Sequence, residues 1–499
     1  MLQTYFVSAL GCKVNQYEAQ QIRETLDGLG LHPVADGFVP DVVVINTCAV
    51  TTRALRKSRH LVRHWARHGR TQVIVVGCGA AADGIGFARI DGVTALITHE
   101  DDLPGRLSKI LDRGSLSSRG NGPSTFQRNP SRAAGGCLSD RHGGTATIAA
   151  NSAKVGATPS SDSSTTTKAP TGTQVKWELL GTVRRFSDHQ RAFLKVQDGC
   201  DARCTYCIIP SLRPRLVSKP IELAVREATD LVAAGHREIV LTGICLGAYG
   251  RSTAGRRRLE EGPSPLAKLI EALGSVPGLV RLRLSSLEPG DVTDELLDVL
   301  ARSSVCVPHL HLPLQSGADE ILRRMNRPYR ATEYLATVER VRQVLEQPAI
   351  TTDIIVGFPG ETNEQFEQTL KIVKQVGFAR VHAFPFSPRA GTPTDRWRDS
   401  LPSHGVVRER MHRLESLAGE TALAFRRGFV GQTVRVIVES LTPQGWQGRT
   451  DRYFPVTFPA PPEPDLRGQV VHVDIRSVNR DTVTGSLRTE PPPEAKRTS

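Results

Sequence analysis

The stretch GCDARCTYC occupies residues 199–207 and places Cys200, Cys204 and Cys207 within eight residues. Thiolates are soft ligands, and a loop this short aims all three at one small inorganic core. A cubane [4Fe–4S] cluster normally takes four cysteines, so three local cysteines leave one iron open to a non-protein ligand. The loop therefore predicts an iron–sulfur site with one iron available for another molecule.

A zinc knuckle is the alternative interpretation of the same spacing. Structural zinc usually takes four protein ligands, commonly as two C-x-x-C pairs or as a cysteine pair with histidines. The next cysteine after Cys207 is Cys245, which is too distant in sequence to complete a knuckle. The spacing therefore favours the cluster.

This cysteine loop follows the first of six strands that are predicted in residues 181–427. The strands are expected near 192–197, 237–242, 279–285, 307–312, 350–355 and 379–384. Helical patterns fill the gaps between them, for example at 221–234, 265–274 and 331–345. Six strand–helix units predict a partial (β/α)6 TIM-like barrel, in which the chemistry lies at the carboxyl ends of the strands.

Residues 1–112 also alternate between strand and helix patterns, which predicts a doubly wound parallel sheet. The expected strands are 5–10, 42–46, 72–77 and 94–98, and the expected helices are 16–29, 53–68 and 103–111. Cys12, Cys48 and Cys78 each follow one of the first three strands. Ligands of such sheets bind outside the carboxyl ends of the strands, so these cysteines are predicted to converge there. Three unrelated core cysteines are the alternative.

The remaining segments differ in composition. Residues 113–180 are rich in Ser, Thr, Gly and Pro and are predicted to be a disordered linker. Residues 428–491 alternate apolar and polar positions, which predicts a small antiparallel β-barrel of about five strands. The tail at 492–499 is predicted to be disordered. Cys137 in the linker is expected to have no function, and Cys245 and Cys306 are expected to be packed thiols.

Composition and charge limit the function classes. The chain has 499 residues, 39% of them hydrophobic, and contains nine cysteines. It has no apolar run of about 18 residues, so no membrane span is predicted. The start MLQTYFVSAL lacks a basic region and is not expected to be a signal peptide. We expect a cytoplasmic protein, in which so many cysteines favour metal or redox chemistry over disulfides.

The net charge of +13 suggests a polyanionic partner. Seven basic and two acidic residues in 113–175 supply part of this excess, whereas 428–491 carries seven of each. The helix after Cys48 presents an arginine stripe, with no acid between residues 53 and 70: Arg56, Arg59, Arg63, Arg67 and Arg70. We interpret the stripe as a track for nucleic-acid phosphates, with an ordinary solvated face as the alternative.

These motifs together resemble the radical S-adenosylmethionine (SAM) methylthiotransferase family. The resemblance rests on the cysteine loop, on GCKVNQYE and NTCAVT near the N-terminus, and on HLPLQSG, TDIIVGFPGET and FSPRAGT in the core. It covers the chain apart from the linker and the tail, and it identifies residues 428–491 as similar to the TRAM domain, an OB-like module that holds tRNA. Arg213-Pro214-Arg215 replaces the usual Arg-Gly, so a different local loop path is expected.

The resemblance implies two [4Fe–4S] clusters, SAM as cofactor, and a set of site residues. Cys200, Cys204 and Cys207 would hold the cluster that binds and cleaves SAM, and Cys12, Cys48 and Cys78 a second cluster used in sulfur delivery. The candidate contacts for SAM or substrate are Tyr206, Thr242, Gly243, Ser285, Gln315 and Asp353. Each of the strand-end polar residues has the alternative of being an ordinary hydrogen-bonded residue. On the TRAM-like module, Arg449, Arg452, Tyr453 and Phe454 are expected to contact RNA.

The function implied is tRNA methylthiolation, in which a carbon radical is needed to replace an unactivated aromatic C–H. Lys13-Val14-Asn15-Gln16 most resembles the branch acting on N6-threonylcarbamoyladenosine at position 37 of tRNA. Methylthiolation of N6-isopentenyladenosine is the alternative within the family, and a non-catalytic tRNA-binding iron–sulfur protein is the alternative from another class. The implied partners are the anticodon loop of tRNA, a sulfur source, and an electron donor such as flavodoxin or ferredoxin. No membrane is expected to take part.

Overall fold

The computed structural model describes residues 2–35, 37–98, 102–114, 180–187, 189–459 and 463–488. All of these residues belong to one structural unit. The predictions made for 115–179, including Cys137, and for the tail at 492–499 lie outside the described residues.

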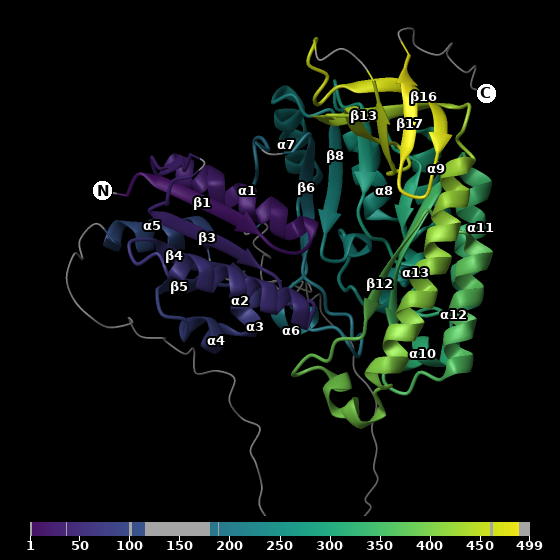
Figure 1. Cartoon of the computed structure of the whole chain (residues 1–499), viewed down its shortest axis with the longest axis horizontal. Helices are drawn as coiled ribbons and strands as arrows, with labels where there is room; N and C mark the ends of the chain where they lie inside the picture. Colours follow the sequence, from purple (N-terminus) through teal and green to yellow (C-terminus); the bar gives the residue numbers. More distant parts are fainter. Residues whose placement is uncertain are drawn as a thin grey trace, which may run out of the picture. The chain divides into compact units, whose positions relative to one another are not determined.

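The N-terminal part is a five-stranded parallel sheet in the order β2-β1-β3-β4-β5 (Figure 1). Its strands are β1 Thr4–Ala9, β2 His32–Pro33, β3 Val42–Thr47, β4 Gln72–Gly77 and β5 Val93–Ile97. Its helices are α1 Lys13–Gly28, α2 Thr52–Ala66, α3 Cys78–Ala82, α4 Gly84–Ala88 and α5 Leu103–Gly114. Every residue of β3 is buried, because α1 and α5 pack on one face of the sheet and α2, α3 and α4 on the other. The predicted doubly wound domain is thus confirmed.

The second part contains six parallel strands arranged as a partial barrel. They are β6 Arg191–Asp198, β8 Glu238–Gly243, β9 Arg281–Leu284, β10 His309–His311, β11 Ala349–Val356 and β12 Arg380–Pro385. Single bridges from Leu282 to Cys306 and from Ser286 to His311 join the β6-β8-β9 sheet to the β10-β11-β12 sheet. The short strand β7 Val217–Ser218, which was not predicted, pairs antiparallel with β6.

Helices lie between and after these strands, and most of them pack on the outside of the barrel, whereas the short helix α6 packs against Ala49 and Cys78 of the N-terminal part. They are α6 Ile209–Leu212, α7 Ile221–Ala233, α8 Pro265–Gly274, α9 Asp294–Arg302, α10 Asp319–Arg324, α11 Ala331–Val344, α12 Asn363–Val376 and α13 His404–Arg427. Short 3₁₀ helices are η2 Leu246–Ala248, η3 Arg256–Glu260, η4 Pro289–Asp291 and η5 Pro393–Ser400. Local sequence sets their ends: Thr362 caps α12, which stops at the left-handed Gly377. The predicted (β/α)6 architecture is confirmed.

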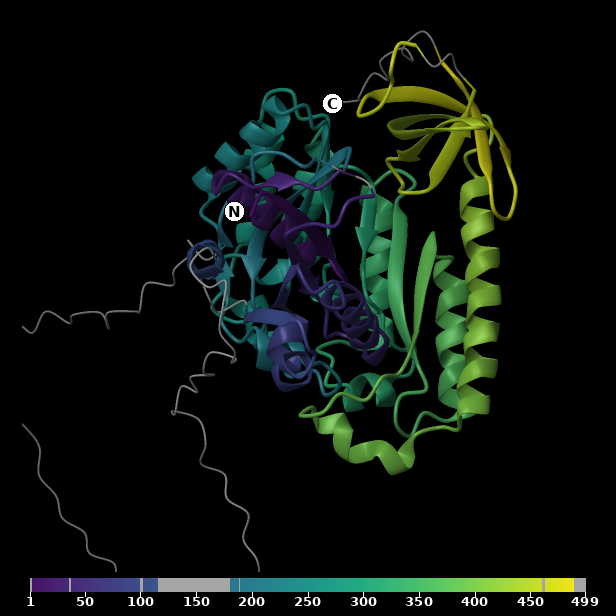
Figure 2. The same ribbon diagram turned by 60° about the vertical axis from the view of Figure 1, so that its left-hand side comes forward.

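The C-terminal part is a closed five-stranded barrel in the order β13-β14-β15-β17-β16. Its strands are β13 Thr433–Thr442, β14 Gly445–Thr450, β15 Pro455–Phe458, β16 Val470–Val478 and β17 Val483–Leu487. Alternate residues face a core that includes Trp446, Phe458 and Ile475, as the period-two pattern predicted. Figure 2 shows the long helix α13 leading directly into this barrel.

Candidate functional site

The Cys200 loop leaves the carboxyl end of β6, which is where the barrel rule predicts chemistry. Gly199 makes the sharp exit possible because its φ is +83°, and a Cβ there would lie 1.7 Å from the Arg215 carbonyl oxygen. The backbone N–H of Cys200 donates to the carbonyl of Arg213 at 2.9 Å, and that of Cys207 donates to Cys204 at 3.2 Å. These bonds hold the three cysteines in one turn of chain.

A buried arginine donates to one of these thiols. Nη1 of Arg327 lies 3.3 Å from Sγ of Cys204, and Nη2 of the same guanidinium lies 3.0 Å from the Glu288 carboxylate. Burial raises the pKa of Cys207 to about 12, so a cation is needed to hold this thiol as a thiolate at neutral pH. The loop therefore has the donor set and the positive charge that an anionic cluster requires.

Cys245 departs from its predicted role as an isolated packed thiol. It follows β8 and is only half-buried, and its interaction with Cys200 lowers the pKa of the Cys200 thiol and raises that of Cys245 well above its usual value. Cys306, in contrast, is buried against the barrel core, and burial raises its pKa to about 11. The prediction is thus wrong for Cys245, while Cys306 is a packed thiol.

The three N-terminal cysteines lie at the carboxyl edge of the first sheet. Burial raises the pKa of Cys12, Cys48 and Cys78. The negative charge of a second cysteine of the triad raises each of these pKa values further. A Cβ on Gly11 would lie 2.8 Å from Sγ of Cys48, so glycine is required for this approach. Among the described residues no three His, Cys, Asp or Glu side chains are grouped to hold a single metal ion. In a cubane cluster each thiolate binds a different iron, so the three sulfurs lie farther apart than three ligands of one metal ion would.

Two arginines of the barrel reach this N-terminal triad. Nε of Arg213 lies 3.2 Å from Sγ of Cys78. Burial lowers the pKa of Arg389, and the charge of the Cys48 thiolate acts against that shift. Nε of Arg389 is buried without a hydrogen-bond partner among the described residues. Such an orphaned donor beside the thiols fits an anionic group held there.

The other predicted site residues lie at or near the carboxyl ends of barrel strands, around the Cys200 loop. Thr242 and Gly243 close β8, and Ser285 follows β9 with a buried hydroxyl that has no partner among the described residues. Gln315 adopts a left-handed backbone with φ of 67°, and its N–H donates to the carbonyl of Asp353 at 2.8 Å. Strain of this kind is found at ligand sites.

Asp353 and Tyr206 differ in their surroundings. The Asp353 carboxylate lies 3.3 Å from Nε2 of His311 and is partly exposed. Tyr206 packs against the small apolar cluster of Ala318, Ile321, Met325 and Phe358, and burial raises its pKa well above the usual value. The contacts of these two residues with SAM or substrate stay predictions.

The residues predicted to contact RNA on the C-terminal barrel are used differently. The ring of Tyr453 lies 4.9 Å from the Arg283 guanidinium and 4.9 Å from the His309 ring, both on strands of the large barrel. Arg452 donates to the carbonyl of Glu346 at 3.1 Å. Phe454 is buried in the barrel core and Arg449 pairs with Glu439 at 3.4 Å. That prediction is wrong, because these side chains hold the two barrels together or pack internally.

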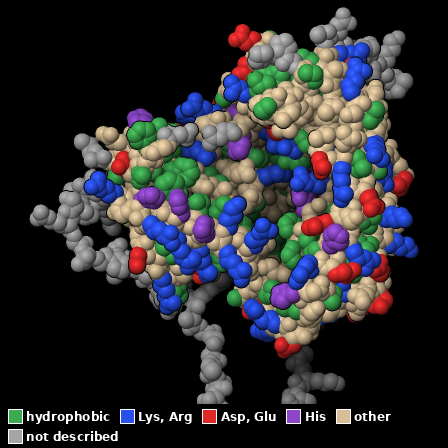
Figure 3. All heavy atoms as spheres, viewed as in Figure 1, with side chains coloured by type: hydrophobic (Ala, Val, Ile, Leu, Met, Phe, Trp, Pro, Cys, Tyr) green, Lys and Arg blue, Asp and Glu red, His purple; other side chains and the backbone are tan. Residues whose placement is uncertain are grey.

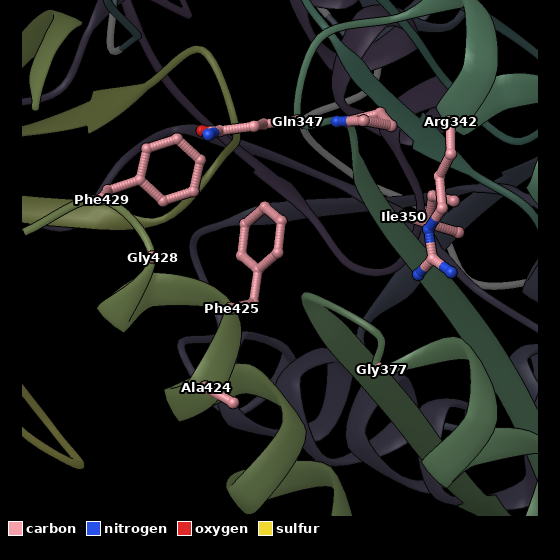
Figure 4. A pocket seen from close by; sticks show the side chains of 9 residues that line it. Arg342, Gln347, Ile350, Gly377, Ala424, Phe425, Gly428 and Phe429 are labelled. Atoms are coloured by element: carbon pink, nitrogen blue, oxygen red, sulfur yellow. The ribbon is translucent and has the colours of Figure 1, made fainter.

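A cavity of about 430 Å³ lies at the opposite end of the large barrel from the cysteine loops. Ile350 lines it at the start of β11, and Phe425 and Phe429 line it from the end of α13 and the following turn (Figure 4). Because barrel chemistry occurs at the carboxyl ends of strands, this cavity is not part of the candidate site.

The arginine stripe on α2 is largely exposed, and Lys and Arg side chains gather over this helix in Figure 3. Arg59 is the exception, because its guanidinium pairs with Asp83, with Nε of Arg59 2.7 Å from the carboxylate. The exposed basic members are Arg53, Arg56, Lys57, Arg63, Arg67 and Arg70. These exposed side chains are therefore available to a polyanion, whereas Arg59 is already paired with Asp83.

The chain matches three known protein families. Residues 194–373 match the Radical SAM superfamily, residues 4–98 match the uncharacterized protein family UPF0004, and residues 427–487 match the TRAM domain. None of the helices in the described part of the chain has the length and apolar character needed to cross a bilayer.

Relatives cover nearly the whole chain. A threonylcarbamoyladenosine tRNA methylthiotransferase of Chlamydia pneumoniae is 34% identical over 91% of both chains. A tRNA-2-methylthio-N(6)-dimethylallyladenosine synthase of Erythrobacter litoralis is 32% identical over 97% of both chains. Among solved structures, the radical SAM methyltransferase TsrM of Kitasatospora setae is similar in fold, with a TM-score of 0.52 and 16% identity over 79% of this chain and 74% of TsrM.

Proposed function

Because the chain belongs to the radical SAM methylthiotransferase family, we propose that it converts N6-threonylcarbamoyladenosine at position 37 of tRNA to its 2-methylthio derivative. The chain is an enzyme of the transferase class, and its family uses a [4Fe–4S] cluster and SAM. The substrate is supported by the name of the Chlamydia relative. The structural observation that supports this reaction is the proximity of the two cysteine triads, which are joined through Arg213: its side chain donates to Cys78 and its carbonyl accepts from Cys200.

We assign the first cluster to Cys200, Cys204 and Cys207, and a second cluster to Cys12, Cys48 and Cys78. The donor sets fit, because each triad is supplied with an arginine N–H that points at one of its sulfurs. When bound, the first cluster supplies the electron that cleaves SAM and so generates the radical needed at an unactivated carbon. The second cluster would serve sulfur delivery.

The residues around the first triad would bind SAM and orient it. Ser285 supports this assignment because its buried hydroxyl lacks a partner among the described residues. Thr242, Gly243, Gln315 and Asp353 surround the same mouth of the barrel, and Tyr206 would flank the cluster with its ring. The chain's part in the reaction is to hold SAM, sulfur and base in one orientation, since effective proximity lowers the barrier.

Methylthiolation of N6-isopentenyladenosine remains the second candidate. The Erythrobacter relative, named for the dimethylallyl substrate, is nearly as similar as the Chlamydia relative, at 32% against 34% identity. Lys13-Val14-Asn15-Gln16 favours the threonylcarbamoyl substrate. A tRNA-binding iron–sulfur protein without catalysis is the third candidate.

We propose that tRNA binds across α2, whose exposed arginines lie on the helix that follows Cys48. On the TRAM barrel the exposed Arg476, Arg480 and Arg488 of the β16–β17 hairpin are further candidates for RNA contact. The proposed partners also include a sulfur source and a reducing donor such as flavodoxin or ferredoxin, and the proposed place of action is the cytoplasm.

The decisive experiment supplies reduced, reconstituted protein and SAM with tRNA carrying either modified adenosine. We expect the nucleoside mass to rise by one methylthio group in place of hydrogen for the threonylcarbamoyl substrate, with formation of 5′-deoxyadenosine. A rise for the isopentenyl substrate alone would support the second candidate. Binding of tRNA without 5′-deoxyadenosine would support the third.

A further inference from the structure

Arg213 is in contact with both cysteine triads. Its side chain is 1% exposed, and its Nε donates to Sγ of Cys78 at 3.2 Å. Its backbone carbonyl accepts the N–H of Cys200 at 2.9 Å. The two sulfur sites, 122 residues apart between Cys78 and Cys200 in the sequence, are thus joined through a single residue.

A buried ion network fixes the Arg213 guanidinium. Nη1 lies 2.9 Å from a carboxylate oxygen of Glu18 on α1 and 2.7 Å from one of Asp198 at the end of β6. Lys195 completes the network, with its ammonium 2.9 Å from Glu18 and 2.6 Å from Asp198. The positive charges of Arg213 and Lys195 balance the carboxylates of Glu18 and Asp198. A thiolate at Cys78 would therefore give the network one net negative charge.

The same network reaches the Cys200 loop. The Asp198 carboxylate accepts the N–H of Gly199 at 2.7 Å, the residue directly before Cys200. Glu18, in turn, belongs to the helix that begins immediately after Cys12. A displacement of either cysteine loop would therefore break charge-assisted bonds that are shielded from water, where an unpaired charge is costly.

The end of the large barrel makes a second, independent contact with the N-terminal part. Ser387 accepts the N–H of Thr52, at the start of the helix that follows Cys48, at 3.0 Å. The barrel is thus joined to the N-terminal part at Cys78 and at the start of α2.

We propose that Arg213 is a positioning residue that fixes the N-terminal cluster site against the SAM-cleaving loop and, by its N–H···S bond, raises the reduction potential of that site. The inference rests on the proposed function, because it assumes a cluster on Cys12, Cys48 and Cys78. Hydrogen bonds to ligand sulfur stabilise the reduced, more negative cluster. A rigid link between the sites also keeps the sulfur within reach of the carbon radical.

The test compares Arg213→Lys with Arg281→Lys. Lysine keeps the charge but cannot reach Cys78, Glu18 and Asp198 together, since it lacks the guanidinium fork. Arg281 is the matched control because it is also fully buried between two carboxylates, those of Glu238 and Asp451, and does not touch either triad. Both variants are made in the full chain and in a background with Cys200, Cys204 and Cys207 changed to Ala, which leaves only the N-terminal site.

In that background we expect the reduction potential of the remaining cluster, followed by its electron paramagnetic resonance signal, to become more negative in Arg213→Lys and to stay unchanged in Arg281→Lys. In the full chain we expect the ratio of methylthiolated nucleoside to 5′-deoxyadenosine to fall about 10–100-fold in Arg213→Lys, as for other residues that orient ligands. Formation of 5′-deoxyadenosine itself should continue.

An unchanged potential together with an unchanged product ratio in Arg213→Lys would overturn the proposal, as would equal shifts in both variants. If Arg213→Lys does not fold, Arg213→Met combined with Glu18→Gln removes one charge of each sign and leaves the Lys195–Asp198 pair. The proposed function fails separately, if the unmodified protein binds iron for only one cluster or makes no methylthiolated nucleoside.

Discussion

Tyr453 is a tyrosine surrounded by cations. Its ring centre lies 4.7 Å from the guanidinium carbon of Arg449, 4.9 Å from that of Arg283 and 5.4 Å from that of Arg191. Burial alone would raise the pKa of Tyr453, but the arginine charges, that of Arg191 above all, outweigh it and lower the pKa to about 8. We expect one tyrosine to ionise near pH 8 in a titration followed by phenolate absorbance, and Tyr453→Phe to remove that step.

The same shift makes stability depend on pH. An unfolded tyrosine has a pKa of about 10, so between pH 8 and 10 the folded chain binds fewer protons than the unfolded chain. The stabilising contribution of Tyr453 therefore grows as the pH rises through this window and is lost as the pH falls through 8. Urea unfolding should show a difference between wild type and Tyr453→Phe that increases from pH 8 to pH 10. A difference that decreases over this range would contradict the assignment.

Gly199 is the glycine whose replacement should disturb the Cys200 loop most directly. A left-handed backbone costs a non-glycine residue about 1–3 kcal/mol, and the new Cβ would also collide with the Arg215 carbonyl. We expect Gly199→Ala to lower iron content by one cluster. Gly235→Ala is the control, because its φ is +100° but no atom lies within 4 Å of the added Cβ. Equal iron loss in both variants would show that backbone strain, and not the collision, is responsible.

The six cysteines could be found from the sequence because their spacing and their place after predicted strands are local signals. Their partners could not. Arg327 and Cys204 are 123 residues apart, Arg213 and Cys78 are 135 apart, and a buried arginine has the same sequence appearance as an exposed one. The FSPRAGT motif singled out Arg389 as a candidate residue, but the sequence could not show that it interacts with Cys48.

Among the elements, periodicity predicted all six strands of the large barrel to within a few residues, and likewise the helices α7, α8 and α11, because each has one clearly apolar face or an uninterrupted apolar run. It gave no bounds for α9, α12 or the long helix α13. It missed β2 and β7, which have two residues each and are defined only by the strand beside them. The resemblance to the TRAM domain also led to the expectation that Arg449, Arg452, Tyr453 and Phe454 contact RNA. A local pattern cannot show that the loop after β14 is covered by the ends of β6, β9 and β10.

The helix α2 provides a prediction at the scale of an element. Arg56 and Arg63 are exposed and lie on the stripe that we propose contacts phosphates. Reversing both to Glu should weaken tRNA binding and reduce the slope of log affinity against log salt by about two, since each phosphate contact contributes about one. The measurement is a filter-binding series in increasing salt.

Its control changes Arg226 and Lys268 to Glu, which are exposed on α7 and α8 of the barrel exterior. This pair alters net charge by the same amount. An equal loss of slope for both pairs would indicate a general charge effect, and no loss for Arg56 and Arg63 would return α2 to an ordinary solvated helix. Arg59→Gln should act through folding, because Arg59 pairs with Asp83.

For the whole molecule, the main departure from the sequence prediction is how the TRAM barrel is attached. A small β-barrel that contacts RNA through Arg449, Arg452, Tyr453 and Phe454 was expected. Instead Arg281 of β9 donates to the carbonyl of Thr450 at 2.7 Å, and Arg283 donates to that of Asp451 at 2.9 Å. Glu238 of β8 balances both arginines, and they lower its pKa to about 2 despite its burial. The buried charged residues at the start of the large-barrel strands thus find their remaining partners on the small barrel.

The two barrels should therefore unfold as one unit. Asp451 is buried, with its carboxylate 3.1 Å from Arg281 and 2.9 Å from Arg435, and removing one partner of a buried ion pair costs about 3–5 kcal/mol. We expect Asp451→Asn to accelerate hydrogen–deuterium exchange in β6–β9 as well as in β13–β17, because one of the arginines left behind, Arg281, belongs to the larger barrel and the other, Arg435, to the smaller one. Asp465→Asn, which alters an exposed pair with Arg467, should change neither. Faster exchange confined to β13–β17 would mean that the TRAM barrel opens alone, and that its contacts with β9 add nothing to the stability of the core.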